Sequence, residues 1–379
     1  MSGLELAVAA GLLALSLLAV VRAPTLPLVF VAVGATELGH WFALLAVGLA
    51  LGAHSLMVSI VALAAAALFL TPAIRAWRAA PALRQKLRDA FGSSDPIFRW
   101  RDLFRWPIWH RARGERVVIE GPGGPLAMEF YAMRSAARAP VVLLVHGGGW
   151  MAGDSRELTG WNTWLATRGY AVAVVDYRLV PTGVWPAQRD DVLAVIAHLR
   201  ANADRFGIDP DRIVLFGRSA GGQIASAIAA TGGHPWLRGC VCLYAPFDME
   251  FAYEHGSDED VLRSRWLLRC YLGGTPVQKP AHYREASAYF TIRAGAPPFL
   301  LLHGPGDELV WFPQSARFAE RLVELGVPHV LLSLPWARHA FDYNLHGPGG
   351  QALAAALAAF LDHTCGSGER PLAPGLGSG

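Results

Sequence analysis

The chain has 379 residues, a net charge of only +3 and four cysteines. Hydrophobic residues make up 53% of it and charged residues 17%, which is too apolar for an ordinary soluble protein of this length. It has no dense run of Lys and Arg interleaved with aromatic residues, so nucleic-acid binding is not expected. The few cysteines do not indicate an oxidising compartment.

The hydrophobic excess lies near the start of the chain, in apolar runs at residues 4–21, 26–51 and 54–70. Each run is about as long as a bilayer-spanning helix requires. A cleaved signal peptide is the alternative, but it expects basic residues ahead of the apolar segment, and Met1 to Glu5 contains none. The sequence therefore predicts an all-α transmembrane region of about three helices over residues 1–71.

The distribution of Lys and Arg predicts the orientation of this region. Arg22 lies between the first two runs, the second connection has neither residue type, and a basic cluster from Arg75 to Arg88 follows the third run. An outside N-terminus puts all of these charges, and the rest of the chain, in the cytoplasm. The Ala-, Gly- and Arg-rich composition suits a bacterial inner membrane.

Polar residues in and after the apolar runs leave two interpretations open. Glu37 and His40 lie on one helical face of the second run, where ionisable groups are functional candidates. Alternatively, that span begins near Leu38, and Glu37 lies at the interface. Residues 72–114 are basic and aromatic, with a break at 91–96, and are expected to be an interfacial linker at the headgroup level or an ordinary linker packed on the next domain.

From residue 115 to 365, short apolar runs alternate with helical patterns. This alternation predicts an α/β domain with a mostly parallel sheet and helices on both faces. The runs at 116–120 and 126–131 surround a Gly/Pro-rich turn and indicate an opening hairpin. Cys240 and Cys242 alternate within one strand and are expected in the core, with a zinc half-site as the alternative.

Two further segments of this part of the chain lie outside the predicted strands. Residues 246–295 form the longest excursion between strands, and they either cover a pocket or form a surface helix pair. Residues 366–379 are rich in Gly, Pro and Ser and are expected to be a disordered tail.

The segment Gly217–Gly222 (Gly-Arg-Ser-Ala-Gly-Gly) joins an apolar strand to a helical run of small residues. A serine between glycines at such a corner is the nucleophile-elbow pattern. The sharp turn holds the serine in a strained conformation and tolerates little side-chain bulk beside it. The helix N-terminus that follows favours a developing oxyanion. Ser219 is therefore the predicted nucleophile, and a Gly-rich turn with an ordinary serine is the alternative.

His146–Trp150 (His-Gly-Gly-Gly-Trp) directly follows the strand at 141–145. Its three glycines allow backbone N–H groups to approach a ligand closely. This pattern, together with the residue after a nucleophilic serine, is associated with oxyanion stabilisation. Gly148, Gly149 and Ala220 are therefore the predicted oxyanion donors.

The acid and then the base of such a site are expected after the serine in the chain. Asp307 lies in a Gly-rich turn after the strand at 299–302, with Glu308 as its neighbouring rival. His339 follows the last predicted strand, where a general base can reach Ser219. His303 is the one serious competitor for the role of base.

From about residue 115 to 363 the chain resembles the α/β-hydrolase superfamily. Within it, the chain is similar to the hormone-sensitive-lipase-like and BD-FAE-like esterases, which include kynurenine formamidase relatives. The matching segments are His146–Trp150, Asp176–Pro181, Trp185–Asp191, Gly217–Gly222, and those around Asp307 and His339. Three membrane spans depart from that pattern, because most relatives are soluble or have a cap helix or a single anchor.

The resemblance implies an α/β-hydrolase fold in which Ser219 is the nucleophile, His339 the base and Asp307 the residue that orients it. It also implies that His146, together with Asp190 or Asp191, contacts and positions the residues that touch the substrate.

The predicted function is a membrane-anchored serine hydrolase that cleaves carboxylic esters of apolar or lipid-like substrates through an acyl-enzyme. It requires no metal and no organic cofactor. Amide or formamide hydrolysis and acyl transfer are alternatives within this fold. In a different class of function, a non-catalytic membrane scaffold, Glu37 and His40 would matter more than Ser219. The predicted partners are a small-molecule or lipid ester substrate and the bilayer, and the sequence leaves protein partners open.

Overall fold

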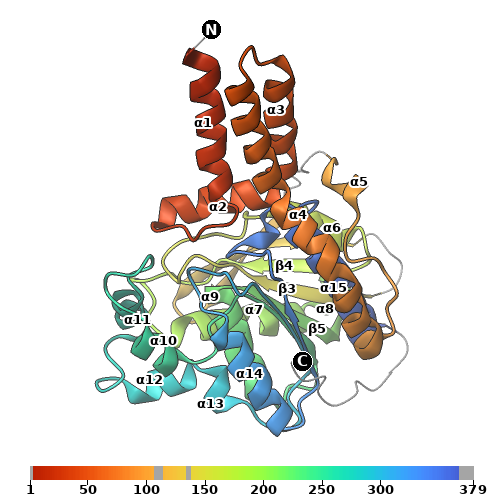
Figure 1. Cartoon of the computed structure of the whole chain (residues 1–379). Helices are drawn as coiled ribbons and strands as arrows, with labels where there is room; N and C mark the ends of the chain where they lie inside the picture. Colours follow the sequence, from red (N-terminus) through yellow and green to blue (C-terminus); the bar gives the residue numbers. More distant parts are fainter. Residues whose placement is uncertain (1–2, 106–113, 134–137, 367–379) are drawn as a thin grey trace.

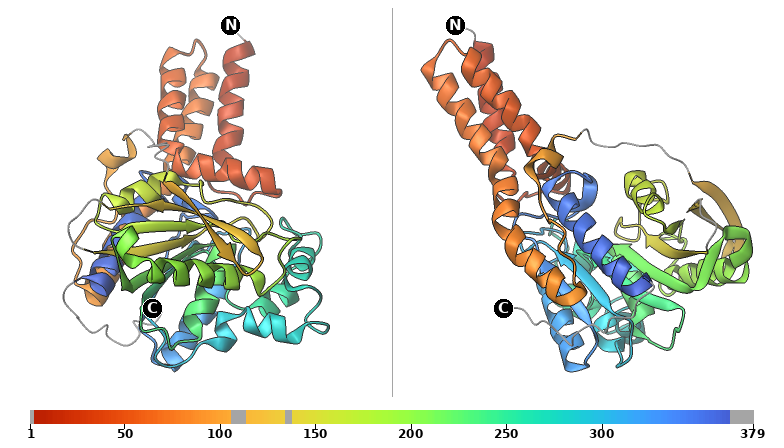
Figure 2. Two further views of the ribbon diagram at one scale, coloured as in Figure 1. Left: turned by 180° about the vertical axis from the view of Figure 1, so that it is seen from behind. Right: turned by 90° about the vertical axis from the view of Figure 1, so that its right-hand side faces the viewer.

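The structure is a computed structural model that describes residues 3–105, 114–133 and 138–366. Apolar helices from the N-terminal residues form a bundle that stands on a larger α/β body (Figure 1). The two parts are in contact along the base of the bundle, and one long helix belongs to both (Figure 2).

An eight-stranded sheet of order β1-β2-β4-β3-β5-β6-β7-β8 forms the centre of the body. β2 runs antiparallel to β1 and β4, and all other neighbouring strands are parallel. The strands are β1 (Glu115–Gly121), β2 (Gly124–Tyr131), β3 (Ala139–Val145), β4 (Ala171–Val175), β5 (Ile208–Arg218), β6 (Leu237–Leu243), β7 (Phe299–His303) and β8 (His329–Ser333). The predicted mostly parallel sheet is confirmed, and the predicted hairpin is β1–β2.

The middle strands contain continuous apolar runs, such as residues 141–145 and 213–216, because both faces of the sheet are covered. One face packs against α7 (Ala187–Ala201), α8 (Ala203–Phe206), α9 (Ala220–Ala230) and α14 (Pro313–Glu324). The other packs against α6 (Thr159–Ala166), α15 (Pro348–Cys365) and the second half of α4 (Leu56–Phe91). Cys240 and Cys242 are buried in this core, with their Sγ atoms 3.6 Å apart.

The excursion between β6 and β7 contains four short helices instead of one helix pair. They are α10 (Met249–His255), α11 (Ser264–Leu272), α12 (Pro280–Glu285) and α13 (Ala288–Thr291). Side chains of α10 and α11 line a pocket at the carboxyl edge of the sheet, which favours the interpretation that this excursion covers a pocket.

The N-terminal region contains α1 (Gly3–Leu17), α2 (Leu26–Glu37), α3 (Gly39–Gly52) and the first half of α4. α1, α3 and α4 stand side by side, and α2 lies across their base on the α/β body (Figures 1 and 2). The predicted second apolar run is therefore two helices, bent by 75° at Leu38. Gly39 permits this bend against α4, because a Cβ there would lie 2.4 Å from the Phe69 carbonyl oxygen.

The described residues do not form three separate membrane-spanning helices. Among them, only α4 is by itself long and apolar enough to cross a bilayer. The α2–α3 pair would be a second span only if the bent pair counted as one, and α1 has 15 residues. Helices of this kind are a weak indication of membrane insertion, so the expectation of three spans is not confirmed.

The predicted boundary at residues 71/72 falls inside α4, which continues through Pro72 and Pro81 to Phe91. α4 extends because its second half gains its own apolar contacts with the α/β body, through Leu83 and Leu87. It ends at Gly92, which has a φ of 72°, where the sequence predicts a break. α5 (Trp100–Leu103) follows, whereas the rest of the predicted linker, 106–113, and the tail, 367–379, lie outside the described residues.

Candidate active site

Ser219 lies at the corner between β5 and α9, at the carboxyl edge of the sheet. Its φ of 51° and ψ of −118° are strained for a residue with a side chain. The flanking glycines are sterically required, because a Cβ on Gly217 would lie 2.2 Å from the Gly221 carbonyl oxygen. A Cβ on Gly221 would likewise lie 2.1 Å from that of Val145. The strand-to-helix corner expected from the sequence is present.

The structure brings three predicted site residues, from loops after β5, β7 and β8, into one chain of hydrogen bonds. His339 Nε2 lies 3.0 Å from Ser219 Oγ, and His339 Nδ1 lies 2.8 Å from Asp307 Oδ2. The second Asp307 oxygen accepts from the backbone amides of Leu309 at 2.8 Å and Val310 at 2.9 Å. These two amides fix the carboxylate, so that Nδ1 carries the ring proton and Nε2 presents its lone pair to the serine.

Burial alone would raise the pKa of the Asp307 carboxyl. The His339 and His303 rings, with the hydrogen bonds that they donate, outweigh it and hold that pKa well below its usual range. Asp307 is therefore an anion at neutral pH, as a residue that orients an imidazole and stabilises its cation must be.

His303, the competing base, is fully buried behind the acid. Its Nε2 lies 2.9 Å from the Val310 carbonyl oxygen and 3.3 Å from Asp307 Oδ2, so this nitrogen carries the proton. Its Nδ1 lies 2.7 Å from Ser315 Oγ. His303 therefore has hydrogen-bond partners other than Ser219 and is not placed to act as the base. Its contact with Asp307 could not be foreseen from the sequence.

Glu308, the rival acid, does not pair with His339. Its carboxylate forms an ion pair with Arg338, the residue before His339, and both side chains are buried.

The glycine loop lies against the candidate nucleophile, since a Cβ on Gly147 would be 3.5 Å from the Ser219 Cβ. Gly148 and Gly149 have φ values of 108° and 59°, which glycine adopts at no steric cost. Trp150 ends the loop, donates from Nε1 to Gln223 Oε1 at 3.0 Å and stacks on Tyr271. These contacts hold the loop over the start of α9, where Ala220 is the first helical residue.

His146 packs against this loop, because a Cβ on Gly153 would lie 2.5 Å from its Nδ1. Its ring stacks on Tyr177 with centroids 4.2 Å apart, and its Nδ1 lies 2.8 Å from the Gly147 carbonyl oxygen. Burial is the largest influence on the His146 pKa and lowers it, so the ring stays neutral at neutral pH.

The predicted support from Asp191 and Asp190 reaches the site indirectly. Asp191 is buried and binds the Arg178 guanidinium at 2.8 Å and the Arg178 backbone amide at 2.9 Å. Two residues further along that loop, the Val180 amide donates to the Trp150 carbonyl oxygen at 2.9 Å. Asp191 therefore stabilises the loop under the glycine segment, whereas Asp190 pairs with Arg189 and is half-exposed.

Sequence reasoning missed a buried polar cluster that joins the elbow to the His339 loop. Arg218 Nε and the Tyr244 hydroxyl both donate to Asp342, at 2.5 Å each. The Tyr244 ring lies 4.4 Å from the His339 ring, centroid to centroid. Arg218 precedes Ser219 and Asp342 follows His339 by three residues, and that proximity to both motifs was the available signal.

A pocket lies beside the glycine loop, under the excursion. Trp150, Leu267 and Leu268 form its apolar wall, and Leu309 and Trp311 extend this wall to the turn after Asp307.

The BD-FAE family model matches residues 128–322, which are 195 of 379 residues. Esterase LipC of Mycobacterium tuberculosis is 33% identical over 239 residues, covering 59% of this chain and 58% of that protein. The probable carboxylic ester hydrolase LipM of the same organism is 31% identical over 216 residues, covering 54% and 50%. The chain thus spans between half and three fifths of the length of these curated relatives.

Solved structures show the same fold. An esterase of Pyrobaculum calidifontis has a TM-score of 0.57 at 25% identity, over 66% of this chain and 85% of that one. An acetyl ester-xyloside bifunctional hydrolase from Caldicellulosiruptor lactoaceticus has a TM-score of 0.55 at 24% identity, over 67% and 97%. Ser219, the glycine loop and Asp307 lie within the region of the family model, and His339 lies beyond its end. The fold is that of an α/β-hydrolase, and the chain belongs to the BD-FAE family.

Proposed function

We propose that the protein is a carboxylic ester hydrolase that acts through an acyl-enzyme on Ser219. The hydrogen-bonded series Asp307–His339–Ser219, with the serine strained at the elbow, is the observation that carries this proposal. The family and the esterase relatives support ester hydrolysis as the reaction.

In the proposed mechanism, His339 Nε2 takes the Ser219 proton as the oxygen attacks the ester carbonyl carbon. The backbone amides of Gly148, Gly149 and Ala220 receive the negative charge on the carbonyl oxygen, and the N-terminus of α9 adds a favourable dipole. His339 then protonates the departing alcohol, leaving an acyl group on Ser219. Water, deprotonated by the same nitrogen, releases the acid and restores the serine. No step needs a metal or an organic cofactor.

The proposed substrates are apolar or lipid-like esters, and the walls of the pocket support this class. The helical bundle supports it too, because it exposes large apolar side chains that no other described residue covers. Among these are Leu44, Leu45, Leu51, Ile60 and Leu63, each more than half exposed. Exposed apolar surface of this kind marks a membrane or protein interface.

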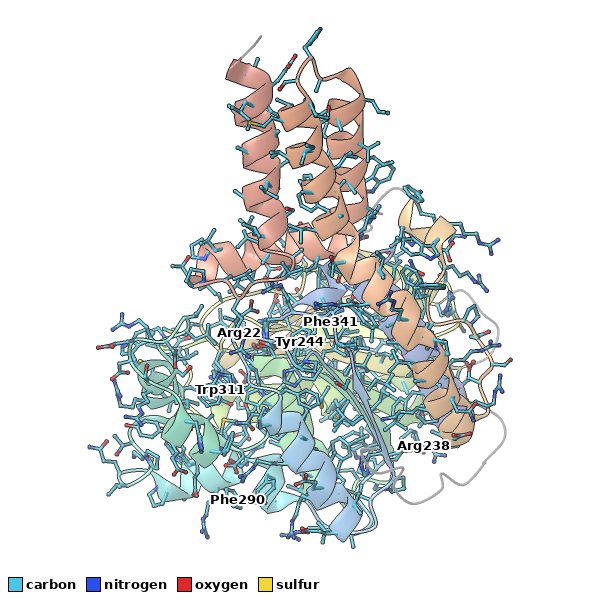
Figure 3. The ribbon with its side chains drawn as sticks, in the orientation of Figure 1. Arg22, Arg238, Tyr244, Phe290, Trp311 and Phe341 are labelled. Atoms are coloured by element: carbon cyan, nitrogen blue, oxygen red, sulfur yellow. The ribbon has the colours of Figure 1, made fainter. Side chains whose placement is uncertain are left out.

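We further propose that the bundle is embedded in the bacterial inner membrane, with its N-terminus outside and the α/β body in the cytoplasm. Arg22 lies at the junction of the bundle and the α/β body (Figure 3), and Arg22 and Arg75 are both close enough to Arg338 of the body to lower its pKa. This is the side on which the rule for cytoplasmic basic residues requires them. α2 would then lie at the headgroup level, with Phe30 and Val31 turned outward.

The test is hydrolysis of nitrophenyl esters from acetate to palmitate by the detergent-purified protein and its Ser219→Ala variant. We expect the wild type to hydrolyse these esters and the variant to be slower by about 10³-fold or more. A fluorophosphonate probe should label only the wild type. The chain-length optimum separates short-acyl from lipid-like substrates. Equal inertness of both proteins on every ester, with no labelling of Ser219, would refute the proposal.

A further inference from the structure

The connection between α1 and α2 runs over the edge of the sheet that carries the acid and the base. Figure 3 labels Arg22 of this connection at the junction between the N-terminal helices and the α/β body. The connection is short, residues 18–25, and two of its backbone groups bind side chains of the body.

Those side chains are Arg338 and Glu308, the buried ion pair next to the candidate active site. Arg338 Nη2 donates to the Val21 carbonyl oxygen at 2.7 Å, and the Ala23 amide donates to Glu308 Oε1 at 3.2 Å. Only 7% of the Arg338 side chain and 3% of the Glu308 side chain is exposed. The connection thus closes a ring of four groups: Val21, Arg338, Glu308 and Ala23.

The positions of the pair in the chain give this ring its significance. Glu308 directly follows Asp307, and Arg338 directly precedes His339. The two residues therefore join the β7 loop to the β8 loop, parallel to the hydrogen bond between the acid and the base. A shift in one loop relative to the other would break the ion pair and the His339–Asp307 bond together.

Stability alone does not account for this pair. Desolvation of two charges largely offsets their attraction, so a buried ion pair contributes little net stability compared with apolar residues. The pair lies in an unfavourable place for a cation, because burial, Arg22 and Arg75 lower the Arg338 pKa to about 10. Such a pair is better explained by the geometry that it enforces.

Other contacts between the same two parts restrain the same loops. Val29 and Ala32 of α2, with Ala23, pack against Leu309, the second residue after the acid. Beyond the base, Glu37 Oε2 accepts from the Gly349 amide at 3.0 Å, and the Glu37 carbonyl oxygen accepts from Asn344 at 3.1 Å. The loop that begins at His339 is therefore held at both of its ends by the N-terminal region.

We propose that the segment Val21–Ala23, through Arg338 and Glu308, positions Asp307 and His339 for catalysis. On this view the N-terminal region is a structural part of the active site as well as its anchor, and Arg338 and Glu308 are positioning residues. The inference rests on the proposed esterase function, because its effect is measured as turnover by Ser219.

The experiment uses the full-length protein, with kcat expressed per serine that reacts with a fluorophosphonate. We expect Arg338→Met to lower kcat about 10- to 100-fold with KM within about 2-fold, since a misplacement of about 1 Å can cost about 10²-fold. Arg338→Lys keeps the charge but loses the planar guanidinium that reaches two acceptors. Its kcat should lie between those of Arg338→Met and the wild type. Ala23→Pro removes the N–H that donates to Glu308 and leaves both members of the ion pair in place, and it should also lower kcat, by several-fold.

Arg212→Met is the control for the loss of an arginine ion pair far from the site, although this pair is more exposed than that of Arg338. Arg212 also combines an ion pair, with Asp209 at 2.6 Å, and a bond to a distant carbonyl oxygen, that of Cys365 at 3.1 Å. It lies just before the apolar part of β5, toward the edge of the sheet opposite to Ser219. Its loss should lower the melting temperature and leave kcat per reactive serine unchanged.

A double variant, Arg338→Met with Glu308→Gln, tests whether the pair acts as a unit. We expect the double variant to lose about as much kcat as Arg338→Met alone, because either substitution already breaks the pair. If Arg338→Met and Ala23→Pro lower only the melting temperature, as Arg212→Met does, the pair is merely structural and the inference is wrong. A wild type that neither turns over esters nor reacts with the probe would instead refute the esterase proposal and the inference with it.

Discussion

Asp342→Asn tests the buried cluster that joins the elbow to the His339 loop. Asp342 is fully buried and its two oxygens accept from two donors, Arg218 Nε and the Tyr244 hydroxyl. An asparagine offers one carbonyl oxygen, so its NH₂ group must face one of these donors. The substitution also leaves the Arg218 guanidinium, only 7% exposed, without its paired charge.

Removing one partner of a buried ion pair costs about 3–5 kcal/mol. We expect the lower end, about 3 kcal/mol, because Glu157 is a second carboxylate close enough to interact with Arg218. For a domain of this size that loss corresponds to a melting temperature lower by about 6–12 °C. Turnover should fall as well, since Arg218 precedes Ser219 in the strained elbow.

The assay is thermal unfolding in detergent at one scan rate, with kcat measured below the transition. Glu324→Gln is the control, since its ion pair with Arg321 is exposed and should contribute less than about 1 kcal/mol. The double variant Arg218→Met with Asp342→Asn should recover part of the stability, because it removes the uncompensated cation. A melting temperature of Asp342→Asn within about 2 °C of the wild type, which corresponds to under about 1 kcal/mol, would refute the reasoning.

Two further predictions concern the protonation of buried histidines and the orientation of the bundle in the membrane. Burial lowers the pKa of His146, His329 and His346, so the unfolded chain binds more protons than the folded one as the pH falls below about 6.5. The melting temperature should therefore be highest above that pH and decrease toward pH 5, with a smaller decrease in His146→Gln; equal melting temperatures at pH 7.5 and pH 5 would contradict this. In intact cells, with Cys270 replaced by serine, Leu56→Cys at the far end of the bundle should react with an impermeant maleimide and Val277→Cys in the body should not. Labelling in the reverse pattern would overturn the proposed orientation.

The strands and the order of the site residues could be predicted because each rests on a local pattern. Runs such as Val141–Val145 are apolar at every position, which is typical of strands in a sheet that is covered on both faces. Ser219, Asp307 and His339 each follow such a run, and strand ends of a parallel sheet share one edge.

Features that depend on long-range contacts could not be predicted in this way. The break at Leu38 separates two helices with no helix-breaking proline there, and the contact of Glu37 with Gly349 joins residues 312 apart. Similarly, Arg338 and Val21 are 317 residues apart, and either alone resembles an ordinary loop residue. α4 is longer than the third apolar run predicts, because packing on the α/β body continues the helix through Pro72 and Pro81.

The continuity of α4 would fix the orientation of the active site relative to the membrane. Its 36 residues form one rod of about 54 Å, whose first half belongs to the bundle and whose second half is packed on the sheet. No flexible tether joins the two parts along this helix, so the α/β body cannot tumble freely once the bundle is embedded. Ser219 would then be kept at one height and one angle relative to the lipid headgroups. If the substrate is a lipid ester, as proposed above, the enzyme would find it by two-dimensional diffusion in the membrane, with the active site held in one orientation.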